Sequence, residues 1–245
     1  MEGSYHDRAA ESSSLRVGLL VPSSNTVMEV DLYRNLPKRM TLHTARMYLE
    51  ETTRSAEIRM IEEFAPKAAE LVKTAKPHLA VFGCTSAGSL GGPQYDREIC
   101  SRLSKITGVP TVGVFSSVRE ALRRSKARSV AVITTYIADI NASIKAGLEE
   151  DGLKVVSIHG MGIDVNFELA TVTAEEITAF SVERLRGVKA DIIFFSCTNF
   201  HAMEALPLLK RELNYPMITS NTATLEAIVT LEKQFQTAGP FDQIS

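Results

Sequence analysis

The sequence predicts an α/β protein with two similar lobes, each built on a parallel four-stranded sheet. Short apolar runs alternate with longer stretches of helical periodicity along the chain. Strands that are apolar throughout and separated by helices indicate parallel sheets covered on both faces. A strand that ends in Cys-Thr also occurs twice, about 113 residues apart, together with its neighbouring segments. Such an internal repeat is most simply explained by two related halves.

The order of the elements follows from these patterns. Runs rich in Val, Ile, Leu and Phe predict strands at 16–21, 41–46, 79–83, 111–114, 129–134, 154–158, 191–196 and 216–219. The intervening periodic stretches predict helices at 28–36, 54–75, 95–106, 117–125, 138–151, 173–187, 202–213 and 221–235.

The repeat extends over three pairs of segments. They are RVGLLVPSSNT with SVAVITTYIADIN, LAVFGCTS with IIFFSCTN, and GVPTVGVFSSVREAL with NYPMITSNTATLEAI. We therefore expect a disordered tail over 1–14, a first lobe over 15–115 completed by 216–237, and a second lobe over 116–215.

Composition excludes several classes of partner. The net charge of −2 and the mixed 23% of charged residues argue against nucleic-acid or anionic-membrane binding. No apolar run approaches the roughly 20 residues of a membrane span, and residues 1–14 contain no signal-peptide core, so we expect a cytoplasmic protein. Three cysteines without CxxC, and histidines without HxxxH or HExxH, predict neither disulfides nor a metal site.

Polar turns follow the predicted strands at the edge where open α/β sheets bind ligands. Two facing halves would place Asn25 and Cys84 opposite Tyr136 and Cys197 in one cleft. A single cysteine after an apolar strand is usually a small buried side chain. Two cysteines at equivalent positions of a repeat instead favour a site, whereas Cys100, in YDREICSRL, has no counterpart and fits the structural role.

The residues after each cysteine are neutral hydrogen-bond donors. Thr85 and Ser86 follow Cys84, and Thr198 and Asn199 follow Cys197. With amides at helix N-termini they would hold the carboxylates of small acids, and the same helix ends would lower a thiol pKa toward neutrality. A facing thiol and thiolate can exchange a proton across one carbon, or one thiolate can add to an activated double bond. Spacing alone leaves both schemes open.

These residues resemble the aspartate/glutamate racemase superfamily, and within it the maleate cis-trans isomerases and arylmalonate decarboxylases. The similarity runs from about residue 15 to 230 and includes VPSSNTVME, GCTSAG, TTYIADIN, GIDVNFELA and SCTNF. It implies two pseudo-symmetric Rossmann- or flavodoxin-like lobes with an active site between them. It also implies that Cys84 is a nucleophile, Cys197 an acid/base partner, and Asn25, Tyr136 and Asn166 substrate-binding residues.

The likeness to maleate isomerases is incomplete. Arylmalonate decarboxylases carry glycine where this chain has Cys84, and isomerases have mainly apolar residues where it has Thr85 and Ser86. The segments GCTS and SCTN are closer to amino-acid racemases, and ectoine-utilisation proteins also have two cysteines.

The resemblance implies an isomerase of small (di)carboxylic acids, most like maleate cis-trans isomerase, that needs no cofactor and forms a homodimer or higher homo-oligomer. Four alternatives stay open: an amino-acid or hydantoin-type racemase, an arylmalonate-type decarboxylase, an ectoine-utilisation-type protein and a non-catalytic carboxylate-binding protein.

Overall fold

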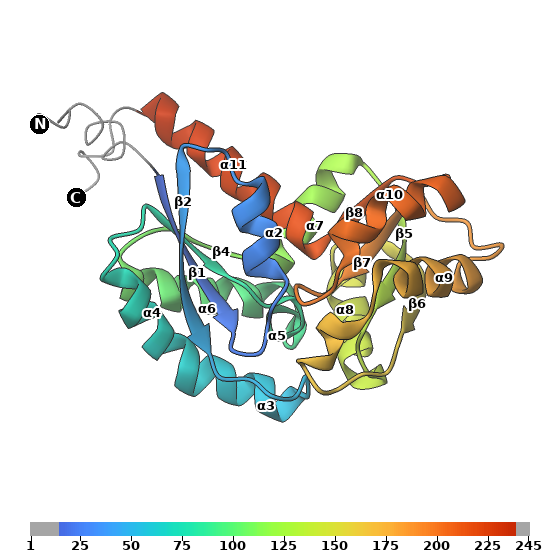
Figure 1. Ribbon diagram of the computed structural model, residues 1–245, viewed down its shortest axis with the longest axis horizontal. Helices are drawn as coiled ribbons and strands as arrows, with labels where there is room; N and C mark the ends of the chain where they lie inside the picture. The colour runs from blue at the N-terminus through green and yellow to red at the C-terminus, as the bar shows by residue number, and fades with distance from the viewer. Residues whose placement is uncertain (1–14, 239–245) are drawn as a thin grey trace, which may run out of the picture.

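The fold, obtained as a computed structural model, has two lobes placed side by side (Figure 1). Residues 15–238 are described; the expected tail over 1–14 lies outside them. Each lobe contains one four-stranded sheet in which every strand pairing is parallel. The predicted α/β class is therefore confirmed.

The two sheets have the same strand order. In the first it is β2-β1-β3-β4, and in the second β6-β5-β7-β8. The first sheet consists of β1 (Leu15–Pro22), β2 (Met40–Met47), β3 (Leu79–Phe82) and β4 (Thr111–Gly113). The second consists of β5 (Ser129–Thr134), β6 (Lys154–Gly160), β7 (Ile192–Ser196) and β8 (Met217–Thr219). The repeat seen in the sequence is thus a repeat of topology.

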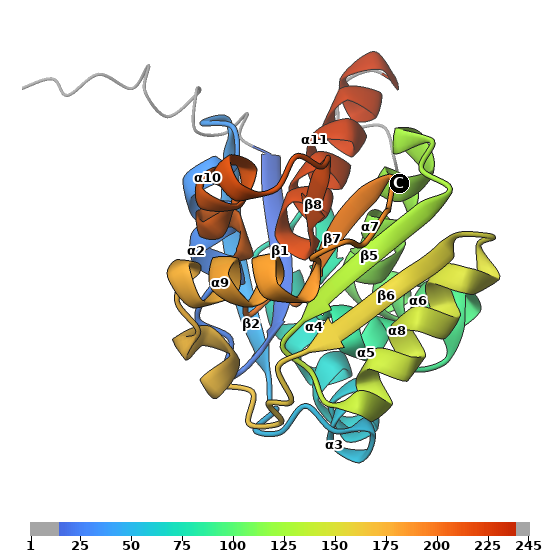
Figure 2. The same cartoon turned by 90° about the vertical axis from the view of Figure 1, so that its right-hand side faces the viewer.

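The central strands are buried because helices cover both faces of each sheet. All residues of β3 and β7 are buried, which accounts for their continuous apolar sequences. Figure 2 shows α9 and α10 to one side of the second sheet and α8 on the other. The helices are α2 (Met28–Asn35), α3 (Arg54–Arg59), α4 (Ala65–Lys73), α5 (Thr85–Ser89), α6 (Gly92–Thr107), α7 (Val114–Ser125), α8 (Ala138–Glu150), α9 (Ala174–Arg184), α10 (Ala202–Glu212) and α11 (Ser220–Ala238).

The helix predicted over 54–75 is present from Arg54 to Lys73, but its middle is not α-helical. A π-helical segment, η1 (Met60–Phe64), separates α3 from α4. Pro66 lies at the start of α4 and has no amide hydrogen for the preceding turn, which is a common cause of such irregularities. The short helix α5 and the 3-10 turn η2 (Glu168–Thr171) were not predicted, because neither has an apolar period.

The end of the chain divides between the lobes differently from our expectation for 216–237. Strand β8 is hydrogen-bonded to β7, so it belongs to the second sheet and not to the first lobe. Helix α11 then crosses back and packs against α7 and α2 (Figure 1). The expected boundary between 115 and 116 falls inside α7.

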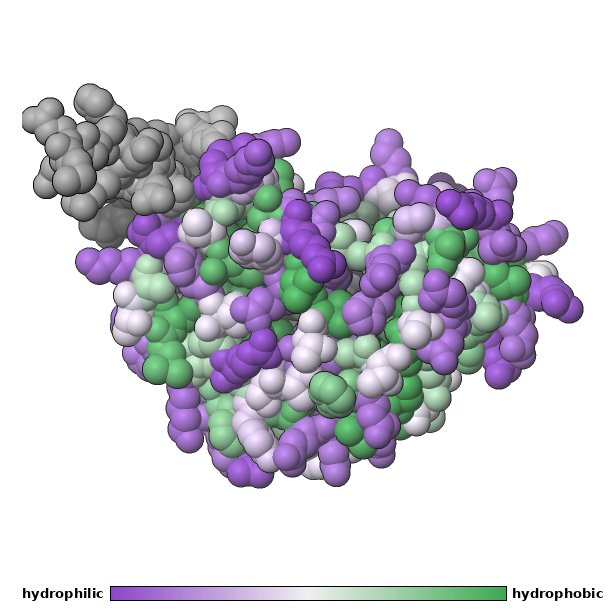
Figure 3. Space-filling view, viewed as in Figure 1, coloured by the Kyte–Doolittle hydropathy of each residue, from purple (hydrophilic) through white to green (hydrophobic). Residues whose placement is uncertain are grey.

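The surface in Figure 3 mixes hydrophilic and hydrophobic side chains over both lobes. Within residues 15–238, no helix is both long and apolar enough to cross a membrane.

Candidate active site

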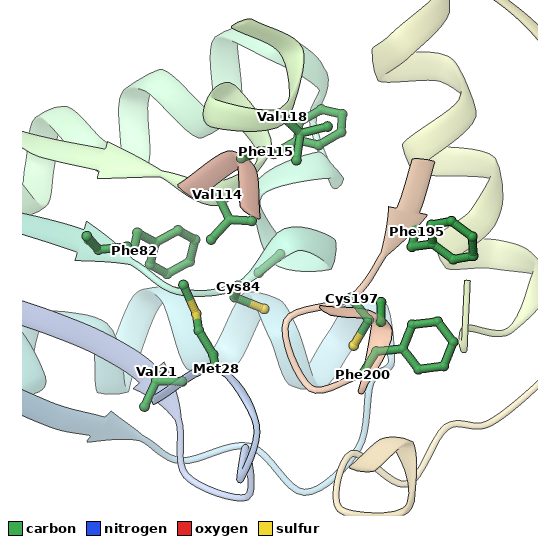
Figure 4. Close-up of a cluster of buried hydrophobic side chains, with 14 of the residues drawn as sticks. Val21, Met28, Phe82, Cys84, Val114, Phe115, Val118, Phe195, Cys197 and Phe200 are labelled. Carbon is green, nitrogen blue, oxygen red and sulfur yellow. The ribbon is translucent and has the colours of Figure 1, made fainter. Parts of the chain in front are cut away.

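Two loops meet where the lobes face each other, and each begins at the carboxyl end of a central strand. Cys84 follows β3 after Gly83, and Cys197 follows β7 directly. A β-carbon at Gly83 would lie 2.8 Å from the carbonyl oxygen of Leu20, so only glycine lets the first loop leave the sheet here. Figure 4 shows the two loops approaching each other, with the sulfur of Cys84 projecting toward the loop of Cys197.

Both thiols are free and almost completely buried. Cys84 is 4% exposed and Cys197 is 3% exposed. The Cys84 sulfur lies 3.6 Å from the Ser86 hydroxyl oxygen. The Asn199 amide donates a hydrogen bond of 3.2 Å to the Cys197 sulfur. Each sulfur is therefore contacted by a polar group two residues further along its own loop, as the internal repeat would lead us to expect.

Ser220 connects the two cysteine loops. This fully buried residue begins α11 just after β8. Its hydroxyl oxygen accepts hydrogen bonds from the Thr85 hydroxyl at 2.9 Å and from the Cys197 amide at 3.2 Å. Ser220 was not among the predicted site residues, although the aligned segments GVFSS and MITSN did indicate a polar turn after the fourth strand of each half.

Asn25 and Thr198 form a second connection between the lobes. The Asn25 side-chain amide donates to the Thr198 hydroxyl at 3.0 Å, and that hydroxyl donates to the Gly83 carbonyl at 3.2 Å. The Asn25 side-chain oxygen also accepts from the amides of Val27 and Met28 at the start of α2. Asn25 thus stabilises the start of a helix and contacts the opposite cysteine loop at the same time.

Asn166 and Asn199 join three loops at the site. The Asn199 side-chain amide donates to the Asn166 carbonyl at 2.6 Å. The Asn166 side chain donates to the Ser24 hydroxyl at 2.7 Å and accepts from the Thr52 hydroxyl at 3.1 Å. Because Ser24 and Thr52 belong to the first lobe, Asn166 holds the lobes together, and a ligand between them must compete for these bonds.

Tyr136 is buried in the second lobe, close to Cys197. Burial, and then the nearby Cys197 and Cys84, raise the pKa of Tyr136 well above its ordinary value of 10.0, so its hydroxyl stays protonated. Burial raises the pKa of Cys197, and it outweighs the opposing influence of the nearby Tyr136 and Thr135 hydroxyls.

The expected lowering of the thiol pKa values toward neutrality is wrong for these buried thiols. Burial, followed by the negative charge of Glu57, raises the pKa of Cys84, and burial raises that of Cys197. The helix-end effect is weak here because α5 has five residues and α10 begins only at Ala202, beyond a turn. Desolvation of a thiolate therefore dominates.

Three further residues complete the description. His201 contacts the Ala170 carbonyl at 3.1 Å and the Glu204 carboxylate at 3.2 Å, so these contacts direct it away from Cys197. Cys100 is buried in α6, as expected for a structural cysteine. Glu57 of α3 is fully buried near Ser86 and was not predicted, because nothing distinguishes it from the other charged residues of its helix.

The predicted site residues are thus brought together by the fold. Their side chains are neutral hydrogen-bond donors, suited to carboxylates, around two thiols that approach from opposite lobes. Within the described part of the chain, no group of three or more His, Cys, Asp or Glu residues is arranged to hold a metal ion.

The sequence is similar to known proteins over most of its length. A sequence model of the arylmalonate decarboxylase family matches residues 17–240. Maleate isomerase from Geobacillus stearothermophilus is 23% identical over 228 residues, covering 87% of this chain and 90% of that protein. Arylmalonate decarboxylase from Bordetella bronchiseptica is 25% identical over 217 residues, covering 87% of this chain and 88% of that protein.

Solved structures share the fold. Maleate isomerase from Pseudomonas putida S16, as a cysteine-to-alanine variant with maleate, has a TM-score of 0.82 at 22% identity and covers 90% of this chain and 92% of its own. A cysteine-to-serine mutant of Nocardia farcinica maleate cis-trans isomerase, with a covalently bound succinylcysteine intermediate, has a TM-score of 0.79 at 21% identity, with 88% and 91% covered. These likenesses confirm the resemblance that the sequence motifs indicated. Since the family match spans nearly the whole chain, the protein belongs to the arylmalonate decarboxylase family.

Proposed function

We propose that the protein is a cofactor-independent isomerase of small dicarboxylic acids that converts maleate, or a close analogue, into its trans isomer. The observation that carries the proposal is the pair of buried thiols, Cys84 and Cys197, which come from equivalent loops of the two lobes and face one site. Maleate isomerases are among the relatives that match this chain along most of its length.

The chemistry requires Cys84 to act as a thiolate. Its sulfur adds to one carbon of the double bond, and the displaced electron pair moves into the carboxylate on the neighbouring carbon. The Cys197 thiol then gives its proton to that carbon, which leaves a thioether with a freely rotating carbon–carbon single bond. After rotation, the Cys197 thiolate takes a proton back, the carbon–sulfur bond breaks and the trans acid is released.

Neutral donors would stabilise the negative charge that develops on the carboxylates during addition. We assign Asn25, Thr85 and Ser86 to the carboxylate nearer the first lobe. The other carboxylate would be held by donors on the Cys197 side of the site, namely Tyr136, Asn166, Thr198 and Asn199. Substrate entry would separate loops now joined by Asn166.

A racemase is the second candidate, and the hydroxyl groups of Thr85 and Ser86 beside Cys84 favour it. In that reaction one thiolate removes the α-proton of an acid and the opposite thiol returns a proton to the other face. A decarboxylase is less favoured, because it would have no evident need for Cys84. A non-catalytic carboxylate-binding protein would need neither thiol to react.

Proton NMR in D₂O with maleate, aspartate, a hydantoin and an arylmalonate separates these functions. The proposal predicts conversion of maleate to its trans isomer, loss of that conversion in Cys84→Ala, and retention in the control Cys100→Ala. Exchange of an α-proton for deuterium would instead indicate the racemase, and loss of CO₂ the decarboxylase. No turnover of any compound would favour the binding protein. A cytoplasmic homodimer stays our prediction, and light scattering tests the dimer.

A further inference from the structure

Glu57 is an acidic residue inside the first lobe, and no salt bridge within residues 15–238 explains its burial. Its side chain is fully buried on α3. Among residues 15–238, neither of its carboxyl oxygens has a hydrogen-bond partner. An ionised carboxylate in such a place is strongly disfavoured, whereas a neutral carboxylic acid is tolerated and has a proton to donate.

Ser86 is a neighbour of both Glu57 and the candidate nucleophile. Its hydroxyl is close enough to the Glu57 carboxyl to influence that group's ionisation, and its oxygen lies 3.6 Å from the Cys84 sulfur. The Ser86 hydroxyl has one proton, so it can point toward the carboxyl or toward the sulfur, but not toward both at once.

The charged groups around Glu57 do not bring its pKa back to the ordinary range of a carboxyl. Burial raises the pKa of Glu57 to about 8; the Ser86 hydroxyl and Arg54 oppose this, and Asp139 of α8 adds to it. The other titratable groups that sense its charge are Tyr95, Tyr136, Cys84 and Cys197. At neutral pH the carboxyl is therefore mainly protonated.

We propose that Glu57 is a positioning residue which, as a neutral acid, donates to Ser86 and thereby directs the Ser86 hydroxyl proton toward the sulfur of Cys84. The inference rests on the proposed role of Cys84 as nucleophile. In this arrangement the thiolate gains a hydrogen-bond donor and meets no like charge. Once Glu57 ionises, it can only accept a hydrogen bond, so the Ser86 proton turns away from the sulfur and a negative charge stands beside the thiolate.

This coupling predicts an unusual pH profile for Cys84. Below about pH 8 the thiolate fraction rises tenfold per pH unit, as for any thiol below its pKa. Above about pH 8 the pair formed by Glu57 and Cys84 loses its first proton from Glu57. The fraction of molecules in the reactive form, with a neutral Glu57 and a Cys84 thiolate, then no longer rises with pH. The reactivity of Cys84 should therefore level off.

The test measures alkylation of Cys84 by iodoacetamide from pH 6 to 9.5 in the full chain, with peptide mass spectrometry to distinguish the three cysteines. In E57Q the amide donates to Ser86 and cannot ionise. We expect its rate to match the wild-type rate at pH 7 and to exceed it about tenfold at pH 9, one pH unit above the midpoint. In Glu57→Leu, which has no donor, the rate at pH 7 should fall severalfold. D96N alters another buried carboxyl of this lobe, which accepts from the Ser116 amide, and should leave the Cys84 profile unchanged.

An E57Q profile that still levels off near pH 8 would overturn the proposal, since another group would then control Cys84. A tenfold loss of rate in E57Q at pH 7, with an unchanged melting temperature, would also overturn it, because Glu57 would then act as a base. The infrared band of a protonated carboxyl, taken as wild type minus E57Q, should disappear with a midpoint near pH 8. None of these measurements uses a substrate, so a failure of the proposed isomerase activity would be seen separately.

Discussion

Replacing Ser220 by alanine tests whether the hydroxyl that joins the two cysteine loops stabilises the interface between the lobes. The substitution removes the acceptor of the Thr85 hydroxyl and of the Cys197 amide, both of which are buried. A buried donor left without an acceptor costs about 1–3 kcal/mol. The Thr85 hydroxyl can rotate to another acceptor, but the Cys197 amide is fixed by the backbone. We therefore expect the free energy of unfolding to fall by about 2–4 kcal/mol.

Urea unfolding, followed by circular dichroism, measures this difference, and Ser181→Ala is the matched control. Ser181 is also a fully buried serine, but its hydroxyl only donates to the Ile177 carbonyl within its own helix. No donor is orphaned there, so its loss should cost less than about 1 kcal/mol. If Ser220→Ala and the control were equally stable, the hydroxyl would not hold the loops together and our reading of this contact would be refuted.

Three further predictions concern Glu57, Thr198 and Cys100. The folded state keeps the Glu57 proton to about pH 8, whereas this carboxyl ordinarily ionises near 4.5, so the folded state binds more protons between these pH values and stability falls as the pH rises through that window. E57Q should remove a loss of about 3–4 kcal/mol between pH 5 and pH 8, measured by urea unfolding at both pH values; an equal fall of the unfolding free energy in both proteins would contradict this. Thr198→Val leaves the Asn25 amide without its acceptor and should lower the unfolding free energy by about 1–3 kcal/mol in the same assay, whereas an unchanged value would mean the contact is dispensable. Cys100→Ala should leave turnover within about twofold, because its thiol is buried in α6 and has no counterpart in the second half of the repeat; a tenfold loss in the NMR assay would argue otherwise.

Strand positions and their repeat could be predicted because a strand covered on both faces must be apolar throughout. β3 and β7 are the clearest cases, since every residue in them is buried. Their equivalent positions in two sheets of the same order also explain why Cys84 and Cys197 could be paired from sequence alone. The carboxyl ends of parallel strands share one edge, so a polar residue after such a strand is placed without knowledge of packing.

Features that depend on packing between distant segments could not be predicted in this way. One example is the end of the chain, where β8 joins the second sheet while α11 crosses back and packs against α7 and α2. The sequence pattern of a strand followed by a helix is the same whichever lobe receives each element.

The ionisation of the site was the least predictable property. Local sequence indicated helix ends beside both thiols, but burial raises the pKa of each thiol, and burial depends on the packing of distant segments. Glu57 stands in RSAEIRMIEE among other acidic and basic residues, and only the packing of α3 distinguishes it as buried.

The most direct test of the central claim is to locate a covalent adduct after incubation with maleate. Serine at position 197 removes the thiol that exchanges the proton. Water can still supply the proton that completes addition to Cys84, but no thiolate takes a proton back, so Cys197→Ser should accumulate maleate as a thioether on Cys84. Peptide mass spectrometry of that variant should find the adduct on Cys84 and none on Cys100, and Cys84→Ala/Cys197→Ser should carry none. An adduct on Cys100, or no adduct together with no isomerisation by the wild-type protein, would contradict the assignment of Cys84 as the nucleophile of a dicarboxylate isomerase.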